Sequence, residues 1–169
     1  MVWYRTIVLY FHWGNYMATG EKIIKLLATG FGSGLSPFAP CTMGTLVGTP
    51  ICLVCLPFTW PIRFLFVIVL SALAIFVSGR AETIYSKKDD QRIVIDEIAG
   101  FQVAMLPVAI TGLNICAAFV LFRIFDIWKP FPIQNLQQLP GGWGVVIDDL
   151  AAGIYAGVLM MLLTYFVKF

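Results

Sequence analysis

Long apolar runs separated by short polar stretches dominate the pattern of this chain. Residues 64–79 and 150–167 are uncharged, and each approaches the roughly 20 residues that a helix needs to cross a bilayer. Residues 46–58 form a shorter apolar run that contains two prolines, which predicts a kinked or tilted span. A tight turn at residues 59–61 would pair this run with 64–79 as a hairpin. The pattern predicts an all-α, multi-pass helical membrane bundle.

The uncharged stretch 98–122 allows two interpretations. One long span would place Asp96 and Asp126 on opposite faces of the membrane. Two short helices joined at residues 107–114 would instead return the chain to the side on which it started. The joint contains a proline, a glycine and an asparagine, which are typical of a break between elements. We therefore expect a second hairpin.

The basic residues support this topology, because Lys and Arg gather on the cytoplasmic side of membrane proteins. With five crossing segments, only Arg63 and Lys168 lie on one side. The other side then holds all the acidic residues, the glycine-rich loop 30–45, the turn 141–144 and the remaining basic residues: Arg5, Lys22, Lys25, Arg80, Lys87, Lys88, Arg92, Arg123 and Lys129. This predicts a polar site at the cytoplasmic face, formed by three polar segments that are distant in sequence.

The composition agrees with a membrane protein. The 169 residues are 60% hydrophobic and 12% charged, with a mean hydropathy of +0.89, whereas soluble domains carry about 25% charged residues. A net charge of +2 without a basic run argues against nucleic acid as a partner. We expect residues 1–25, with their aromatic start, to be an interfacial segment and 26–169 to be one membrane domain. The pair Cys52 and Cys55 is interpreted as buried membrane cysteines.

Two pairs of adjacent acids are the first candidates for chemistry. Asp96-Glu97 and Asp148-Asp149 are each predicted to stand directly before an apolar helix. Helix N-capping would explain one acid at each place, but it explains two adjacent acids between apolar neighbours less well. Four carboxylates beside lipid are costly unless a cation compensates them. The pattern therefore favours metal ligation over capping alone.

A third polar segment carries Arg123, Asp126 and Lys129, which are spaced to form one stripe on a helix. They could be a self-neutralising ion-pair stripe with snorkelling basic side chains. In the functional interpretation, Asp126 joins the metal site and the two basic residues hold phosphate oxygens. Oxygen ligands select a hard cation, so Mg²⁺ is the expected metal.

The loop 30–45 could approach a phosphate closely through its glycines and through the N-terminus of the following helix, although turns use the same residues. The residues that other classes of phosphatase need for catalysis are missing from this sequence. His12 is the only histidine, no cysteine is followed six residues later by arginine, and there is no Asp-x-Asp. Metal-assisted attack by water remains, or a less familiar Asp or Thr nucleophile.

These motifs resemble the phosphatidylglycerophosphatase A family, in order and over roughly residues 26–163. The matching blocks are Gly30-Phe-Gly-Ser-Gly-Leu-Ser-Pro37, Thr42-Met-Gly-Thr45, Asp96-Glu97-x-x-Gly100, Phe122-Arg-Ile-Phe-Asp-Ile-Trp-Lys-Pro130, and Gly141-Gly-Trp-Gly144 through Ile147-Asp-Asp149-x-x-Ala-Gly153. One departure is Cys41, where the family usually has glycine. A glycine with positive φ at that place would make cysteine strained.

The resemblance implies a Mg²⁺-dependent enzyme of bacterial phospholipid synthesis in the inner (plasma) membrane. It would hydrolyse phosphatidylglycerophosphate to phosphatidylglycerol and phosphate. Its partners would be this phospholipid substrate and the surrounding membrane lipids, and the sequence is compatible with a homo-oligomer. The candidate catalytic and metal-binding residues are Asp96, Glu97, Asp126, Asp148 and Asp149. Glu97 is also the candidate base that orients a water. The candidate substrate-binding residues are Ser36, Thr42, Thr45, Arg123 and Lys129.

Two other functions compete with this one. Enzymes that transfer alcohols to a nucleotide-activated diacylglycerol also array aspartates on membrane helices, but their Asp-Gly-x-x-Ala-Arg run is missing here. A small cation-binding transporter or assembly subunit without phosphatase activity would need no phosphate site. It predicts acids paired across the middle of the bilayer, whereas a phosphatase predicts acids gathered at one face.

Overall fold

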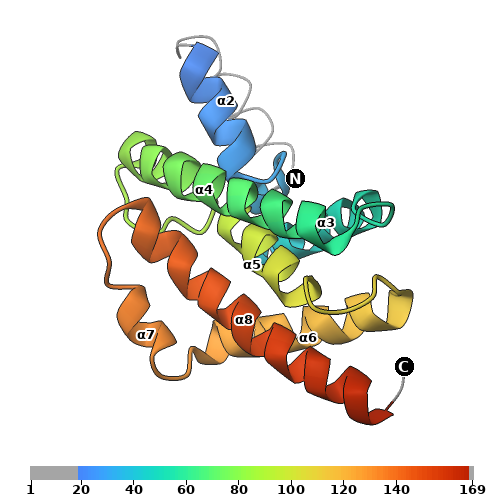
Figure 1. Ribbon diagram of the computed structural model, residues 1–169. Coiled ribbons are helices and arrows are strands. Elements are labelled where there is room, and N and C mark those ends of the chain that lie inside the picture. Colours follow the sequence, from blue (N-terminus) through green and yellow to red (C-terminus); the bar gives the residue numbers. More distant parts are fainter. Residues whose placement is uncertain (1–18, 168–169) are drawn as a thin grey trace.

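The computed structural model describes residues 19–167, and all its regular elements are helical (Figure 1). In chain order they are α2 (Thr19–Ala28), the 3-10 turn η1 (Ser33–Leu35), α3 (Pro40–Val54), α4 (Trp60–Tyr85), α5 (Ile95–Met105), α6 (Gly112–Trp128), α7 (Ile133–Leu136) and α8 (Gly142–Val167). The all-α prediction is confirmed. Most of the interfacial segment predicted for residues 1–25 lies outside the described residues.

The short helix α5 is the centre of the bundle. It packs against α8, α3, α4 and α6, while α2 packs on α4. In Figure 1 α5 lies between α4 and α8. Phe101 and Met105 of α5 are fully buried and share one core cluster with Phe122 of α6 and Met160 of α8. Residues at the start of α5 are therefore held by several helices at once.

Two helices of the described chain, α4 and α8, are long and apolar enough to cross a membrane. Only 22% of the most apolar stretch of α4 is buried inside the protein. Its exposed side chains include Leu65, Val69 and Phe76. A surface of this kind is stable against lipid tails and unstable against water, so the helix agrees with the predicted membrane bundle.

The predicted hairpin of runs 46–58 and 64–79 is not observed, because α3 packs along α5 and not along α4. Gly44 and Gly48 give α3 a face without side chains. A Cβ at Gly44 would lie 2.5 Å from Cβ of Val94, and one at Gly48 would lie 2.8 Å from Cδ1 of Phe101. This close fit draws α3 onto α5. Helix α3 also begins earlier than predicted, with Pro40 in its first turn, where proline is favoured.

The stretch 98–122 is a hairpin of two short helices, as predicted. Helix α5 ends at Met105, and α6 begins at Gly112 after the cap residue Thr111, whose hydroxyl accepts a hydrogen bond from the amide of Asn114. The two helices pack against each other. Asp96 and Asp126 consequently lie at the same end of the bundle.

Asp148 and Asp149 do not precede the last helix, contrary to the prediction. Helix α8 begins at Gly142, so both residues lie about two turns inside it. Gly141 makes the preceding turn at φ +59°. A Cβ at Gly142 would lie 2.7 Å from the amide nitrogen of Gly79 in α4. The glycines interpreted as a turn therefore also form the first turn of a helix that packs closely on α4.

Candidate metal centre

Carboxylates from two helices meet inside the protein. Asp96 and Glu97 come from the first turn of α5, and Asp149 comes from α8. One ligand oxygen from each of the three residues lies within 4.8 Å of the others. Their exposed fractions are only 5%, 5% and 4%. A buried set of oxygen ligands at this spacing suits a hard divalent cation.

The other two predicted acids lie beside this group. Asp126 stands in the last turn of α6, and its side chain is close enough to the side chain of Asp149 to interact with it electrostatically. Asp148 precedes Asp149 on α8 and is buried as well. Asp126 and Asp148 are close enough to interact electrostatically. The structure thus brings all five predicted acids together from three helices, and we call Asp96, Glu97, Asp126, Asp148 and Asp149 the carboxylate cluster.

Several oxygens of the carboxylate cluster have no hydrogen-bond partner among the described residues. One buried oxygen each of Asp96, Glu97, Asp148 and Asp149 is in this state. An unsatisfied buried polar atom costs about 1–3 kcal/mol, and more when it is charged. A divalent cation bound among these oxygens would supply the missing partner, so the residues present fit such an ion.

Helix capping does not account for the carboxylate cluster. Asp96 and Glu97 do stand in the first turn of α5, where the helix dipole favours negative charge. Asp126 stands in the last turn of α6, where the same dipole disfavours a carboxylate. Asp148 and Asp149 lie well inside α8. Only one of the three positions gains from the end of a helix.

The two basic candidates form ion pairs with the carboxylate cluster. Arg123 pairs with Asp126 one turn further along α6, as the ion-pair interpretation predicted. Lys129 does not continue that stripe: it ends α6 at φ 44° and pairs with Asp148 of α8. Burial alone would lower the pKa of Lys129, but the hydrogen bond to Asp148 and the negative charges of Asp148 and its neighbouring carboxylates together outweigh burial and raise the pKa above its ordinary value. The ammonium therefore stays charged beside the cluster.

The three hydroxyl candidates are placed less directly. Ser36 accepts a hydrogen bond from the amide of Phe38 and donates one to its carbonyl, which closes a local turn. Thr45 is fully buried and donates to the carbonyl of Cys41 in its own helix. Thr42 is half-buried in the first turn of α3. The hydroxyl bonds of Ser36 and Thr45 stay within their own segments, so the structure does not join these hydroxyls to the acids.

The glycine-rich loop packs against the segment that leads into α5. Gly30 has φ +50°, and a Cβ there would lie 2.9 Å from Cδ1 of Ile98. A Cβ at Gly34 would meet the carbonyl of Arg92. The amide of Val94 donates to the carbonyl of Ala28, at 2.8 Å. The glycines allow this close approach and place the loop beside the start of α5.

Cys41 is a neighbour of the site whose contact was not predicted. Its thiol lies close enough to Glu97 for the two side chains to interact electrostatically. It is an ordinary helical residue of α3, and the positive φ of 44° belongs to Ala39. The expected strain at Cys41 is therefore absent. Its place in the motif beside Thr42 was the signal that could have brought it to attention.

Comparisons with known proteins agree with the site. The family model of phosphatidylglycerophosphatase A matches residues 26–164. Phosphatidylglycerophosphatase A of Escherichia coli K12 is 36% identical, covering 79% of this chain and 80% of the relative. The Haemophilus influenzae protein of the same name is 39% identical, covering 84% and 89%.

A Bacteroides thetaiotaomicron protein, provisionally named a phosphatidylinositol-3-phosphatase, is 38% identical, covering 80% of this chain and 89% of the relative. No solved structure shows significant similarity to this one. The family match extends over most of the chain and includes every residue of the carboxylate cluster. The chain therefore belongs to the phosphatidylglycerophosphatase A family.

Proposed function

We propose that this protein is a Mg²⁺-dependent lipid phosphatase that hydrolyses phosphatidylglycerophosphate to phosphatidylglycerol and phosphate. Membership of the family makes it a phosphoric monoester hydrolase. The observation that carries the proposal is the carboxylate cluster, in which buried oxygens from different helices lack partners. Two relatives named for this activity support the choice of substrate.

Asp96, Glu97 and Asp149 are the residues that would hold Mg²⁺, because their oxygens already lie within 4.8 Å of one another. Asp126 and Asp148 would complete the negative surroundings. A bound Mg²⁺ would supply positive charge for the phosphate oxygens in a site that excludes water. Five carboxylates face only two cations, Arg123 and Lys129, so the cluster has negative charge to spare for the ion.

The remaining groups would bind and orient the substrate. Arg123 and Lys129 would exchange part of their contact with Asp126 and Asp148 for phosphate oxygens, since both cations have donors left. Glu97 would accept a proton from the attacking water. The water oxygen forms a bond to phosphorus, the ester bond from phosphorus to the glycerol oxygen breaks, and that oxygen leaves as a hydroxyl after taking up a proton.

The position of the carboxylate cluster favours a phosphatase over a cation transporter. Its acids gather where α5 begins and α6 ends, with α8 contributing a position near its own start. A transporter predicts acids paired across the middle of the bilayer. The predicted excess of basic residues at this end supports a site that faces the cytoplasm in a multi-pass protein of the bacterial inner membrane, where it would serve phospholipid synthesis.

A second substrate has a specific observation in its favour. The Bacteroides relative is named for a phosphoinositide headgroup and is as similar to this chain as the other two relatives. Both headgroups carry a phosphomonoester on a membrane lipid, so the same cluster could act on either. We favour phosphatidylglycerophosphate because the family model and two relatives are named for it.

The test is free phosphate released by purified protein in detergent. Phosphatidylglycerophosphate and phosphatidylinositol 3-phosphate are compared, each with Mg²⁺ and with a chelator in its place. We expect phosphate release from phosphatidylglycerophosphate only with Mg²⁺. Phosphate release from the inositol lipid alone would show that the substrate is a phosphoinositide and not phosphatidylglycerophosphate. The absence of release from both lipids would contradict the proposed function.

A further inference from the structure

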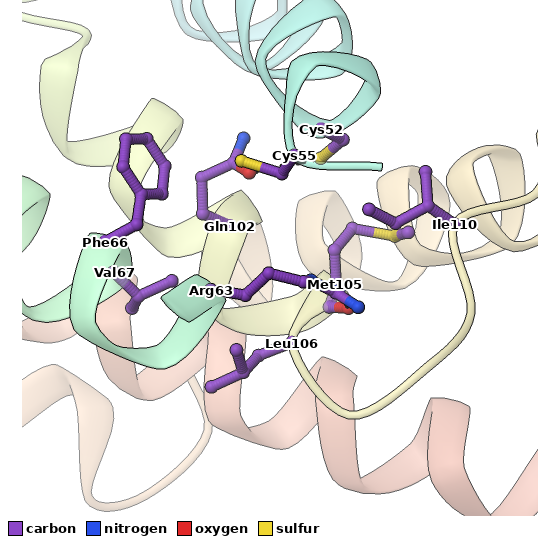
Figure 2. A pocket seen from close by; sticks show the side chains of 9 residues that line it. All are labelled: Cys52, Cys55, Arg63, Phe66, Val67, Gln102, Met105, Leu106 and Ile110. Atoms are coloured by element: carbon purple, nitrogen blue, oxygen red, sulfur yellow. Dashed lines mark hydrogen bonds between the residues drawn. The ribbon is translucent and has the colours of Figure 1, made fainter. Parts of the chain in front are cut away.

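The end of α5 opposite the carboxylate cluster is held by polar side chains (Figure 2). Arg63 of α4 and Gln102 of α5 line a small recess there, together with Cys52 of α3, Cys55 directly after α3, and Met105 of α5. Figure 2 shows Arg63 extending toward Met105, and Gln102 reaching toward the two cysteines. Neither Arg63 nor Gln102 has a part in the proposed chemistry, so their contacts need another explanation.

Arg63 binds the C-terminal end of α5. Its guanidinium donates to the carbonyl of Met105 at 2.6 Å and to the carbonyl of Val108 at 3.4 Å. The last carbonyls of a helix have no partner within the helix, and at membrane depth water cannot replace one. A cation also interacts favourably with the negative end of the helix dipole. In its own helix, by contrast, Arg63 stands in the first turn, where a cation is disfavoured.

Gln102 fastens α5 to α3. Its amide donates to the carbonyl of Gly48 at 2.7 Å, and its oxygen accepts from the thiol of Cys52 at 3.2 Å. Gln102 is 5% exposed, so these bonds are shielded from water. These bonds lie in the same interface between α3 and α5 in which Gly48 packs against Phe101. The register between α3 and α5 is thereby fixed by polar bonds as well as by packing.

These contacts bear on the site because α5 is short and carries two of the three proposed metal ligands, Asp96 and Glu97, at its other end. Asp96 and Met105 stand nine residues apart, which is about 14 Å along a helix. Eleven residues cannot span a bilayer of about 30 Å. The length of α5 therefore does not set its depth among its neighbours.

We propose that Arg63 and Gln102 are positioning residues that fix α5 in depth and register, and so place Asp96 and Glu97 against Asp149. The inference rests on the proposed function, because it concerns the metal site of that function. It adds two residues outside the cluster, each acting through α5. Losing either anchor lets α5 shift against α8, which spreads the oxygens that must converge on the cation.

The experiment measures binding of Mn²⁺, used as a paramagnetic substitute for Mg²⁺, by electron paramagnetic resonance on purified full-length protein. The variants are Arg63→Gln, Arg63→Lys and Gln102→Met. The matched control is Arg80→Gln, which removes an exposed charge from the same helix α4. Thermal unfolding is recorded for every variant, so that affinity is compared only among folded samples.

We expect the Mn²⁺ dissociation constant to rise about tenfold in Arg63→Gln and Gln102→Met, equivalent to about 1.4 kcal/mol. Arg63→Lys should recover part of the loss, because an ammonium still donates to the carbonyls. Arg80→Gln should bind as the wild type does. If Arg63→Gln does not fold, Arg63→Lys and Gln102→Met decide.

Two other results have distinct meanings. Folded variants with a lower melting temperature but unchanged Mn²⁺ affinity would show a merely structural role and overturn the inference. A wild-type protein that binds no Mn²⁺ would instead contradict the proposed metal site, and the inference with it. The two failures are therefore told apart by the wild-type sample.

Discussion

Asp126 is the residue of the carboxylate cluster that its own helix stabilises least. It stands in the last turn of α6, against the dipole, and its side chain lies near that of Asp149. Arg123 one turn earlier compensates it through an ion pair. Lys129 does the same for Asp148. Each basic residue balances a carboxylate in the structure, and under the proposed function each would also bind phosphate.

Neutralising either basic residue should weaken substrate binding. We expect Arg123→Gln and Lys129→Gln each to lower kcat/KM about 10- to 100-fold, the effect of losing one hydrogen bond between charged groups, about 1.5–3 kcal/mol. Most of the loss should appear as a higher KM in phosphate-release kinetics. Lys88→Gln, at an exposed position between α4 and α5, is the control. Unchanged kinetics in both site variants would exclude them from phosphate binding.

The acids themselves could be predicted from the sequence, because adjacent carboxylates between apolar residues are conspicuous in a membrane protein. The contacts of Cys41 and Gln102 could not. Cys41 faces Glu97 only because α3 crosses α5 at Gly44, and Gln102 finds its partners across the same crossing. A lone polar residue in an apolar run marks a place to inspect, but the partner depends on packing.

At the scale of elements, the close contact of α5 and α8 builds the site. A Cβ at Gly100 would lie 2.6 Å from the carbonyl oxygen of Asp149 and 2.7 Å from Cε2 of Phe122. Gly153 meets α5 in the same way, with its Cβ position 3.0 Å from Cβ of Val103. The small residues at this interface bring Asp149 next to Asp96 and Glu97. Gly153 and Gly157 of α8 are thus used for packing against α5 within the chain.

Gly100→Ala should therefore separate the two helices at the site. The obstructing atom belongs to the backbone of α8 and cannot turn aside, so we expect a loss of about 1–3 kcal/mol of stability, typical of overpacking, together with reduced phosphate release. Gly112→Ala is the matched control, because nothing lies within 4 Å of a Cβ at that position. Thermal unfolding and activity are measured on both. Equal behaviour of the two variants would contradict the packing argument.

The turn before α5 supplies a test that depends on pH. Asp90 binds the side chain and amide of Arg92, and the hydrogen bond from that guanidinium lowers the pKa of the Asp90 carboxyl below its ordinary value. The pKa is lower in the folded than in the unfolded chain. This pair therefore stabilises the fold fully above about pH 4 and loses its contribution as the pH falls through the folded value.

We expect Asp90→Asn to lower the melting temperature at pH 7. The difference from wild type should shrink as the pH is lowered from 5 toward 2, because protonation removes the same charge from the wild type. Thermal unfolding at a series of pH values measures this. A difference that stays constant over the whole series would show that the charge of Asp90 has no part in holding the turn.

The sequence predicted the apolar runs and the break between α5 and α6 well, but it placed the start of α8 too late. The glycine-rich segment 141–144 has the sequence of a turn, but only Gly141 lies in the turn and the residues after it are helical. Gly142 is helical because it fits closely against α4, and a sequence does not display the surface of a distant helix. The prediction of a hairpin between α3 and α4 was wrong for the same reason, because the glycines of α3 fit closely against α5 and not against α4.

At the scale of the whole molecule, the direction of the helices decides where the chemistry lies. The start of α5, the end of α6 and the early turns of α8 meet at one end of the bundle, and Arg63 holds α5 at the opposite end. This convergence could be predicted once 98–122 was interpreted as a hairpin. The side of the membrane that each end faces follows from the distribution of basic residues and is a prediction.

The orientation can be tested by labelling single cysteines in a variant that lacks the four native ones. Lys88→Cys lies between α4 and α5, at the end with the carboxylate cluster, and Gly112→Cys lies at the opposite end, where α6 begins. A membrane-impermeant maleimide added outside intact cells should label residue 112 and leave residue 88 unmodified. Labelling of residue 88 alone would show that the carboxylate cluster faces the outside of the membrane, contrary to the prediction.

The most direct test of the account is phosphate release from phosphatidylglycerophosphate as a function of Mg²⁺ concentration, by the wild type and by Asp96→Asn and Asp149→Asn. Each variant keeps the size of its side chain and removes one charged ligand oxygen from the cluster. We predict Mg²⁺-dependent release by the wild type and a loss of about 100-fold or more in both folded variants, as for a lost group that stabilises the transition state. Activity that survives in both would contradict the carboxylate cluster as the metal-dependent site.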